Sequence, residues 1–234
     1  MFRGVHRPML DRVSIVIPTY NESKNLPMIV DKLLEISDEI AKEVEIVIVD
    51  DNSPDGTGKI ADDMALKHSN ITVIHRQGKF GVGTAVYAGV KAAEASHVVM
   101  MDADLHHQPH FVPSITKYLQ NYEIVIASRF IDGSKMEAAS FQRRFATRVG
   151  NFLARSLLHL GVKDYTHGFR GYSKSAFLEC YHQSDTGGEY NLRLLVEAQR
   201  KGYRTFEVPY SSDHMGKSKM TTWLKYLWIL ILMI

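Results

Sequence analysis

The chain has 234 residues, 45% hydrophobic and 23% charged, a composition that suits one globular domain with a sizeable core. Its 28 Lys and Arg residues nearly balance 26 Asp and Glu residues, so bulk charge does not indicate a nucleic-acid-binding protein. The single cysteine, Cys180, excludes a disulfide within the chain and suits a reducing compartment. We interpret it as a small buried residue without a chemical role.

Short runs of β-branched residues alternate with longer helical patterns along the chain, and no internal repeat interrupts them. This alternation predicts an α/β fold with a mostly parallel central sheet flanked by helices. In such sheets, ligands bind beyond the carboxyl ends of the strands. In chain order, the predicted strands are Val13–Ile17, Val44–Val49, Ile71–His75, His97–Met101, Glu123–Ala127 and Thr205–Val208.

Polar residues follow directly after the first two predicted strands. The first strand is followed by Pro18-Thr19-Tyr20-Asn21-Glu22, and the second by Asp50-Asp51-Asn52-Ser53-Pro54-Asp55-Gly56-Thr57. An aromatic ring and carboxylates at these places suit a nucleoside, whose base and ribose offer hydrogen-bond donors. Helix capping by the Asn, Ser, Asp and Thr side chains is the alternative, but it does not explain the doubled Asp50 and Asp51.

The third strand leads into a basic loop, His75 to Ala85, that contains three glycines. Backbone N–H groups of such a loop, at the start of a helix, can bind phosphate. A dinucleotide fingerprint would need a further glycine where Val86 stands, and an ATPase loop would end in Gly-Lys-Ser or Gly-Lys-Thr. The loop therefore argues against a dehydrogenase or an ATPase and favours a mononucleotide or nucleotide-sugar site.

The fourth strand ends in Met100-Met101-Asp102-Ala103-Asp104-Leu105-His106, which places two carboxylates one residue apart. Asp-x-Asp pairs are often only solvated turns or helix caps. After an apolar strand, however, Asp102 and Asp104 can present a hard divalent cation to a diphosphate, with His106 as a candidate third ligand. We interpret the neighbouring His107 and His110 as surface residues and not as ligands.

The ordered segments Pro18 to Glu22, Asp50 to Thr57 and Asp102 to Asp104 resemble those of the family 2 glycosyltransferases, most of all the polyprenyl-phosphate branch. The similarity covers roughly Val13 to Met220. It implies the GT-A type of fold, which binds nucleotide-diphospho-sugars, and metal-dependent, inverting transfer of a hexose, mannose favoured, to dolichyl or undecaprenyl phosphate. Later similar segments are Ala127-Ser128-Arg129, Gln142-Arg143-Arg144, Gly168-Phe169, Glu207-Val208-Pro209 and Gly216-Lys217-Ser218-Lys219.

The resemblance also implies a role for individual side chains. A phosphate acceptor is already an anion at neutral pH, so its attack needs positioning and charge compensation but no strong base. Mn²⁺ or Mg²⁺ would be the metal, and an imidazole ligand favours manganese. The implied sets are Pro18, Tyr20, Glu22, Asp50, Asp51, Asp102 and Ala103 for the donor; Asp102, Asp104 and His106 for the metal; Asp104, Arg129 and Arg143 for catalysis; and Arg143, Arg144, Lys217 and Lys219 for the acceptor phosphate.

The basic residues have simpler alternatives. The arginines could form the exposed face of a helix running from about Gln142 to Leu160, and the lysines could be solvated loop charges or contacts to lipid headgroups. Three positions also depart from the family pattern, and the first is His106, where relatives usually have Gln. Asp213 stands where relatives usually have Arg, and Arg193 where some have Glu. We hypothesise that these two residues form an ion pair that restores a cation to the site.

We expect one catalytic domain at 1–222 and an apolar segment at 223–234 that is too short to span a bilayer, either an interfacial helix or the start of a truncated membrane segment. Because no apolar run precedes Met9, we expect a cytoplasmic protein, peripheral on the cytosolic face of a membrane. Its expected partners are GDP-mannose, or else a UDP-sugar, a polyprenyl phosphate, the membrane surface and, as an option, a small membrane-anchoring subunit, but no nucleic acid.

Two other functions fit the same sequence. A family 2 glycosyltransferase acting on a hydroxyl of a glycan, protein or small molecule would need a general base, and Asp164, Glu189 and Asp213 are the candidates. A non-catalytic nucleotide-sugar-binding scaffold is the other alternative, against which the intact Asp102 and Asp104 argue.

Overall fold

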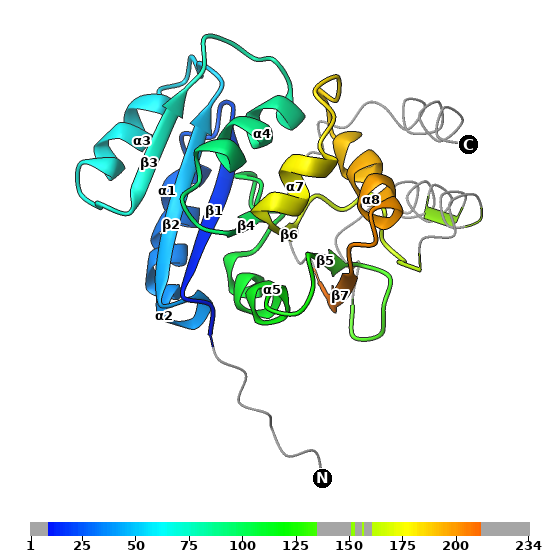
Figure 1. Ribbon diagram of the computed structural model, residues 1–234. Helices are drawn as coiled ribbons and strands as arrows, with labels where there is room; N and C mark the ends of the chain where they lie inside the picture. Colours follow the sequence, from blue (N-terminus) through cyan, green and yellow to red (C-terminus); the bar gives the residue numbers. More distant parts are fainter. Residues whose placement is uncertain (1–8, 135–150, 153–155, 157–160, 212–234) are drawn as a thin grey trace.

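A computed structural model describes residues 9–134, 151, 152, 156 and 161–211 of the chain. Within these residues the central feature is a seven-stranded sheet of order β3-β2-β1-β4-β6-β5-β7 (Figure 1). β6 runs antiparallel to both β4 and β5, and the other neighbouring strands pair in parallel. The strands are β1 (Arg12–Thr19), β2 (Glu43–Asp50), β3 (Ile71–His75), β4 (His97–Met100), β5 (Ile124–Ser128), β6 (Arg170–Ser173) and β7 (Thr205–Pro209).

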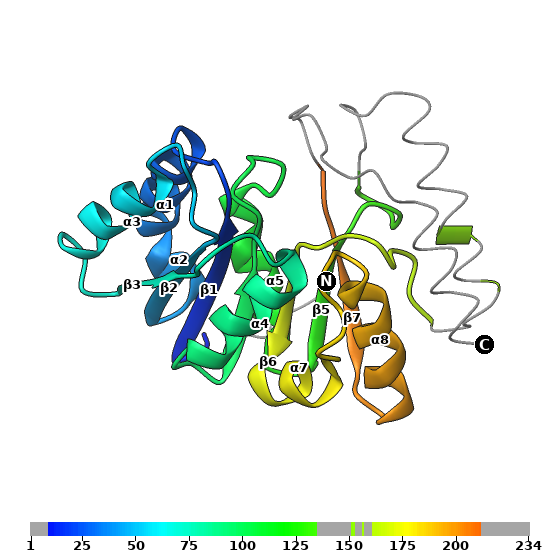
Figure 2. The ribbon, with the colours of Figure 1, turned by 90° about the horizontal axis from the view of Figure 1, so that it is seen from above.

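Helices cover both faces of this sheet, so the fold has three layers (Figures 1 and 2). One face packs against α1 (Asn25–Glu35), α2 (Ser37–Ile40), α3 (Thr57–Ala65) and α5 (Val112–Leu119), with the short 3₁₀ helix η1 (Pro109–Phe111) next to α5. The other face packs against α4 (Val82–Ala92), α7 (Lys174–Cys180) and α8 (Tyr190–Arg200).

The central strands form because their side chains are apolar on both faces. In β1, Ile15 and Ile17 enter the core under α1, while Val16 between them enters the core under α4. A parallel strand buried on both sides reads as a continuous hydrophobic run, which is why these strands were predictable. α4 approaches β1 closely at Gly89, where an added Cβ would lie 2.4 Å from Cγ1 of Val16.

The predicted α/β class and the mostly parallel sheet are confirmed, and all six predicted strands are present with small shifts at their ends. The seventh strand, β6, was not predicted, because the sequence Arg170-Gly171-Tyr172-Ser173 has no apolar alternation. Cys180 is buried as expected, and burial raises the pKa of its thiol to about 11.

Two expectations from the sequence concern a helix and an apolar segment that lie mostly or wholly outside the described residues. Most of the helix expected at 142–160 and the whole apolar segment 223–234 lie outside the described residues. Among the residues that are described, none of the helices combines the length and apolar character needed to cross a membrane.

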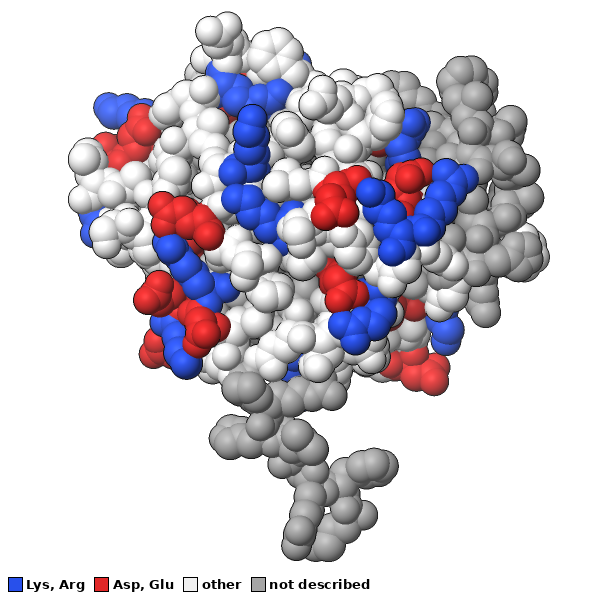
Figure 3. Space-filling model, viewed as in Figure 1, with Lys and Arg blue, Asp and Glu red and all other residues white. Residues whose placement is uncertain are grey.

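The near balance of acidic and basic residues in the composition is also seen within small areas of the surface. On the face viewed in Figure 3, many basic side chains lie beside acidic ones in small groups separated by uncharged surface, and one group near the centre is basic alone. Ion pairs of this kind include Arg200 with Glu197 at 2.9 Å and Lys201 with Glu179 at 3.8 Å.

Candidate active site

Side chains of unusual polarity gather at the carboxyl end of the parallel strands. Tyr20 follows β1, Asp51 follows β2, Asp102 lies two residues after β4, and Arg129 follows β5. Strand register brings the first of these together, since Thr19 pairs with Asp50 and Val16 pairs with Met100. Ligands of open α/β sheets bind at this edge.

Asp51 forms a nearly buried ion pair with a residue of the basic loop. Its Oδ1 lies 2.9 Å from Nη1 of Arg76, and the two side chains are 6% and 12% exposed. Burial raises the pKa of Asp51, and the charge of Arg76 opposes that rise. Lys79 of the same loop places its Nζ 4.1 Å from the centre of the Tyr20 ring. The Asp51 carboxylate, the Tyr20 ring and the two basic side chains thus lie at the sheet edge where nucleoside binding was predicted.

Asp50 has a different environment from Asp51, although both were predicted to bind the donor. The Asp50 side chain is turned into the loop after β2: Oδ1 accepts the hydroxyl of Ser53 at 2.6 Å and Oδ2 accepts the Ser53 backbone N–H at 3.1 Å. The Thr19 hydroxyl donates a longer bond of 3.3 Å to Oδ1. Asp50 therefore shapes the loop that presents Asp51.

The neighbouring loop after β1 is tied to the second loop. The backbone N–H of Glu22 donates to Oγ1 of Thr57 at 2.9 Å, and that of Ser23 donates to Asp55. Burial alone would raise the pKa of Asp55, but hydrogen bonds from Thr57 and Ser23 lower it to about 2. Asp55 thus accepts from Thr57, the first residue of α3, but the N-cap position is Gly56, and the predicted side-chain cap is absent from both α3 and α1. Pro18, the remaining predicted donor residue here, lies in β1 beside Val49.

Asp102 and Asp104 both remain accessible at the end of β4, with side chains 40% and 39% exposed, whereas Ala103 between them is buried. Oδ1 of Asp104 accepts the backbone N–H of His106 at 3.1 Å. Leu105, within this turn, has a φ of 63°, a left-handed conformation that costs a leucine about 1–3 kcal/mol. Such strain is typical of functional loops.

His106 lies next to this pair, as predicted. Its Nε2 is 3.9 Å from Oδ2 of Asp104 and is buried without a hydrogen-bond partner among the described residues. Groups of three or more His, Cys, Asp or Glu residues placed to hold a metal were not found in the described part of the chain. Protein ligands there would need to be completed by oxygens of a bound diphosphate.

His107 was predicted to be a surface residue, and this prediction is wrong. The side chain is 4% exposed, and its Nδ1 accepts the backbone N–H of Asp102 at 2.8 Å. Burial lowers the pKa of His107. His110, in contrast, is exposed as expected. One usable signal for His107 was its position directly after the Asp-x-Asp turn, but nothing in the local sequence indicated its burial.

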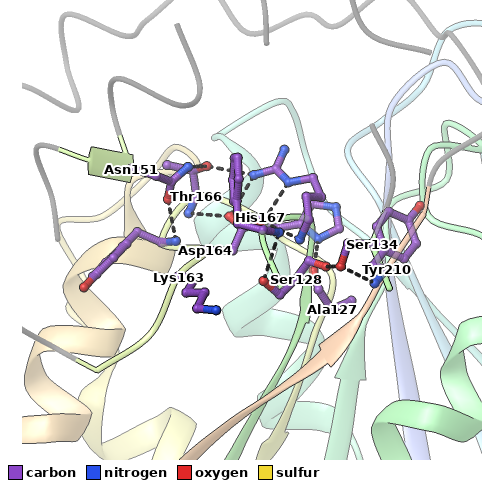
Figure 4. Close-up of polar contacts among 12 residues, drawn as sticks. Ala127, Ser128, Ser134, Asn151, Lys163, Asp164, Thr166, His167 and Tyr210 are labelled. Carbon is purple, nitrogen blue, oxygen red and sulfur yellow. Dashed lines mark hydrogen bonds and ion pairs between the residues drawn. The ribbon is translucent and has the colours of Figure 1, made fainter. Parts of the chain in front are cut away.

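Arg129 is held by a buried carboxylate, in the network shown in Figure 4. Its Nε and Nη2 each donate to Asp164 at 2.8 Å, and Nη2 also donates to Oγ1 of Thr166 at 2.9 Å. Burial works against ionisation of Asp164, but the charge of Arg129 holds the pKa of Asp164 well below its usual range. Asp164, a candidate general base, is therefore fully occupied by its own chain.

The segment that carries Asp164 is fixed from two sides, and the side held by Asn151 is visible in Figure 4. Glu207 of β7 accepts the backbone N–H groups of Lys163 at 2.8 Å and Asp164 at 3.0 Å. Oδ1 of Asn151 accepts the backbone N–H of Tyr165 at 2.7 Å. Arg129 is thus oriented by residues that sequence reasoning did not connect with it, because they are distant along the chain.

One backbone N–H of the glycine-containing loop is bound within the chain itself. The N–H of Gly83 donates to the carbonyl of Thr186 at 2.9 Å, and an added Cβ on Gly83 would lie 2.5 Å from the carbonyl oxygen of Asp185. The start of α4 is therefore covered by the segment 185–187. This close packing gives the glycines a structural reason, and phosphate binding by the rest of the loop stays a prediction.

The remaining predicted residues either contact other parts of the chain or lie outside the described residues. Arg193 has Asp185 as its partner, with 3.1 Å between Nε and Oδ1, and the carboxylate proposed for it, Asp213, lies outside the described residues. The acceptor-phosphate set also lies outside them, namely Arg143, Arg144, Lys217 and Lys219. Glu189, the other candidate base, accepts the backbone N–H of Gly187 at 2.9 Å.

Comparison with known proteins agrees with this arrangement. The family model described as glycosyl transferase family 2 matches residues 14–180. An undecaprenyl-phosphate mannosyltransferase from Micrococcus luteus is 33% identical over 217 residues, covering 90% of this chain and 88% of that protein. A polyprenol monophosphomannose synthase from Mycolicibacterium smegmatis is 32% identical over 219 residues, covering 90% of this chain and 81% of that protein.

Solved structures of glucosyl-3-phosphoglycerate synthase from Mycobacterium tuberculosis share the fold. One has a TM-score of 0.71 and 19% identity, covering 95% of this chain and 80% of that chain. Another, in complex with Mn²⁺, UDP and glucosyl-3-phosphoglycerate, has a TM-score of 0.67 and 18% identity, covering 94% and 76%. Together with the family model and the two bacterial relatives, these findings show that the chain belongs to glycosyl transferase family 2 and is a glycosyltransferase with the GT-A fold.

Proposed function

We propose that this glycosyltransferase transfers a hexose, with mannose favoured, from a nucleotide-diphospho-sugar to a polyprenyl phosphate. The observation that carries the proposal is the placement of Asp102 and Asp104, exposed after β4, at the sheet edge that also holds Tyr20 and Asp51. The acceptor class and the sugar are supported by the names of the two bacterial relatives, which are a mannosyltransferase and a monophosphomannose synthase. GDP-mannose is the favoured donor, and a UDP-sugar is the alternative.

The residues after β4 fit a divalent cation. Two accessible carboxylates offer oxygen donors that suit Mn²⁺ or Mg²⁺, and Nε2 of His106 is buried without a hydrogen-bond partner among the described residues. A cation held by Asp102 and Asp104, with His106 as the candidate third ligand and diphosphate oxygens completing the set, would neutralise the charge that develops on the leaving diphosphate. Solved structures with this fold contain Mn²⁺ together with UDP, which supports the choice of metal.

The remaining site residues bind and orient the donor. Tyr20 offers an aromatic face to the base, and Asp51 offers a carboxylate to donors of the base or ribose. Arg129, fixed by Asp164, contributes a positive charge whose direction is set before the donor arrives. Preorganised charge of this kind stabilises a transition state without reorganisation at the moment of reaction.

The acceptor phosphate needs no general base, because it is already an anion at neutral pH. Its oxygen attacks the anomeric carbon while the bond to the diphosphate breaks, and one such displacement inverts that centre. We assign compensation of the acceptor charge to Arg143, Arg144, Lys217 and Lys219, and to Arg143 also a part in catalysis. An acceptor in the bilayer would place the enzyme on the cytosolic membrane surface, by its own segment 223–234 or through a small anchoring subunit.

Transfer to a hydroxyl acceptor has less support. That reaction needs a general base, and Asp164 is withdrawn from this role by five hydrogen bonds, from the backbone N–H, Nε and Nη2 of Arg129 and from the backbone N–H groups of Thr166 and His167. A carboxylate that accepts so many bonds stays ionised and buried, and cannot reach a substrate proton.

The direct test is incubation of the purified protein with Mn²⁺, a short-chain polyprenyl phosphate and radiolabelled GDP-mannose or UDP-glucose in parallel, counting label in the organic phase. The variants are Asp104→Ala and, as a matched control, Asp38→Ala, which removes an exposed carboxylate from α2 before β2. We expect label from one donor with wild type and Asp38→Ala, and none with Asp104→Ala. No label from either donor, despite metal-dependent nucleotide binding, would overturn the proposed acceptor or donor.

A further inference from the structure

The imidazole of His107 contacts Asp102 at two points. Nδ1 accepts the backbone N–H of Asp102 over 2.8 Å, and Nε2 lies 3.6 Å from the carboxylate oxygen Oδ2 of the same residue. Because Nδ1 accepts a hydrogen bond, a neutral ring must carry its proton on Nε2. That N–H is on the side of the ring that faces the carboxylate. One side chain thus reaches both the main chain and the side chain of Asp102.

The orientation of the His107 ring is itself fixed by aromatic neighbours. The ring stacks on Phe169 with centroids 4.8 Å apart and an interplanar angle of 12°, and His167 meets it edge-on at 5.0 Å. Both neighbours come from the segment just before β6, which is far from Asp102 in sequence. The loop is held on its other side as well, since the hydroxyl of Tyr210 donates to the carbonyl of His106.

Among the described residues, His107 is the one in hydrogen-bond or ion-pair distance of the Asp102 carboxylate. Its side chain is 40% exposed at the end of a four-residue strand, and the turn that follows contains the strained Leu105. A carboxylate in this situation samples several directions unless another group restrains it. His107 is the buried, rigid group that meets it.

We infer that His107 is a positioning residue, which fixes the peptide and carboxylate of Asp102 in the direction of the donor diphosphate and its cation. The inference rests on the proposed function, because it takes Asp102 as a residue of the donor site. Groups that orient a ligand in this way typically change metal affinity 10–100-fold when they are removed. The Nδ1 contact is the one that a substitution can preserve or remove.

The test compares three substitutions at this position. Oδ1 of an asparagine occupies nearly the place of Nδ1, so His107→Asn keeps an acceptor for the Asp102 N–H. His107→Leu removes that acceptor at similar volume, and His107→Gln moves the polar group one bond further out. His110→Leu is the matched control, because His110 is exposed three residues along the chain.

The first readout is the Kd of Mn²⁺ in the presence of GDP or UDP, measured from the electron paramagnetic resonance signal of free Mn²⁺. We expect a Kd 10–100-fold higher for His107→Leu and His107→Gln, within about threefold of wild type for His107→Asn, and unchanged for His110→Leu. The second readout is metal-free binding of GMP or UMP, which should be equal in all four variants. If His107→Leu fails to fold, the difference in Mn²⁺ Kd between His107→Asn and His107→Gln decides whether the acceptor at Nδ1 matters.

An unchanged Mn²⁺ affinity in His107→Leu or His107→Gln would overturn the inference, and so would an Asn variant as weak as these two. If the His107 variants lost metal-free nucleotide binding as strongly as they lost Mn²⁺ binding, His107 would have a general structural role, and the inference would be overturned as well. A wild-type protein that binds Mn²⁺ with a nucleotide but labels no lipid contradicts the proposed function alone. One that binds no Mn²⁺ contradicts both.

Discussion

The guanidinium of Arg129 and the carboxylate of Asp164 face each other through two hydrogen bonds of 2.8 Å, and the Asp164 side chain is completely buried. Removing one partner of such a pair leaves an uncompensated charge in the interior, which typically costs about 3–5 kcal/mol. Asp164 also accepts three backbone N–H groups, so it joins the end of β5 to the segment before β6. The pair therefore links stability to the orientation of Arg129.

We expect Asp164→Asn to lower the free energy of unfolding by about 3 kcal/mol at pH 7 and to lower kcat more than it raises KM. The folded-state pKa of Asp164 is below its ordinary value of 3.8, so its contribution is present above about pH 4 and declines as pH falls further. Urea unfolding of wild type and Asp164→Asn should show a smaller difference in free energy of unfolding at pH 3 than at pH 7. A difference that is constant across this range would assign the loss to packing instead.

A second prediction concerns the glycines before and within α4. Gly83→Ala places a Cβ 2.5 Å from the carbonyl oxygen of Asp185, which is backbone and cannot move aside easily. Gly78→Ala meets only the Phe80 side chain, at 3.6 Å, which is ordinary contact. Overpacking of this kind costs about 1–3 kcal/mol. Calorimetry should therefore show a Tm lower by roughly 2–12 °C for Gly83→Ala and little change for Gly78→Ala; equal Tm values would mean that the segment 185–187 yields without cost.

Much of this fold was predictable because its strands are apolar on both faces. β6 was not predictable, because its first residue, Arg170, is charged and yet fully buried. The Arg170 guanidinium donates to the backbone carbonyls of Asn191 and Tyr165, each at 2.7 Å. A buried arginine bound to backbone carbonyls has no signature in the local sequence. Its partners become apparent only when α8 and the segment before β6 are in place.

The candidate site divides along the same line. Asp51, Asp102 and Asp104 were predictable because they interrupt apolar strands at their carboxyl ends, a position that depends on local sequence. His107 was misread because its environment comes from a distant segment that includes Phe169. The contact between the glycine loop and Thr186 was not predictable for the same reason. Burial of a polar residue is decided by tertiary packing, and a single sequence carries little information about it.

Tyr20 should contribute to nucleotide affinity through its ring and not through its hydroxyl. Base–aromatic stacking is worth about 1–3 kcal/mol, so Tyr20→Ala is expected to raise the Kd of a nucleoside monophosphate roughly 5–150-fold. Tyr20→Phe keeps the ring, including the face that Lys79 approaches at 4.1 Å, and should bind within about twofold of wild type. Metal-free calorimetric titration separates this effect from the cation. Equal affinities for the Ala and Phe variants would place the base away from this ring.

The last prediction is a pH dependence of stability that comes from His167. This buried residue donates from Nδ1 to the carbonyl of Ala127, and burial, with further contributions from Arg129 and His107, lowers its pKa well below 6.5. Below pH 6.5 the unfolded chain therefore binds a proton that the folded chain excludes, and stability falls as the pH falls. A single such group contributes up to about 1.4 kcal/mol per pH unit.

His167→Asn isolates this contribution, because its side-chain amide can donate from nearly the position of Nδ1 but does not titrate. In urea unfolding between pH 7 and pH 5, the slope of unfolding free energy against pH should be smaller for His167→Asn than for wild type by about 1 kcal/mol per pH unit. The exposed His110 supplies the control, since His110→Asn should keep the wild-type slope. A slope that His167→Asn leaves intact would mean that His167 takes up a proton on Nε2 in the folded state as readily as in the unfolded chain, with its Nδ1 bond to Ala127 kept.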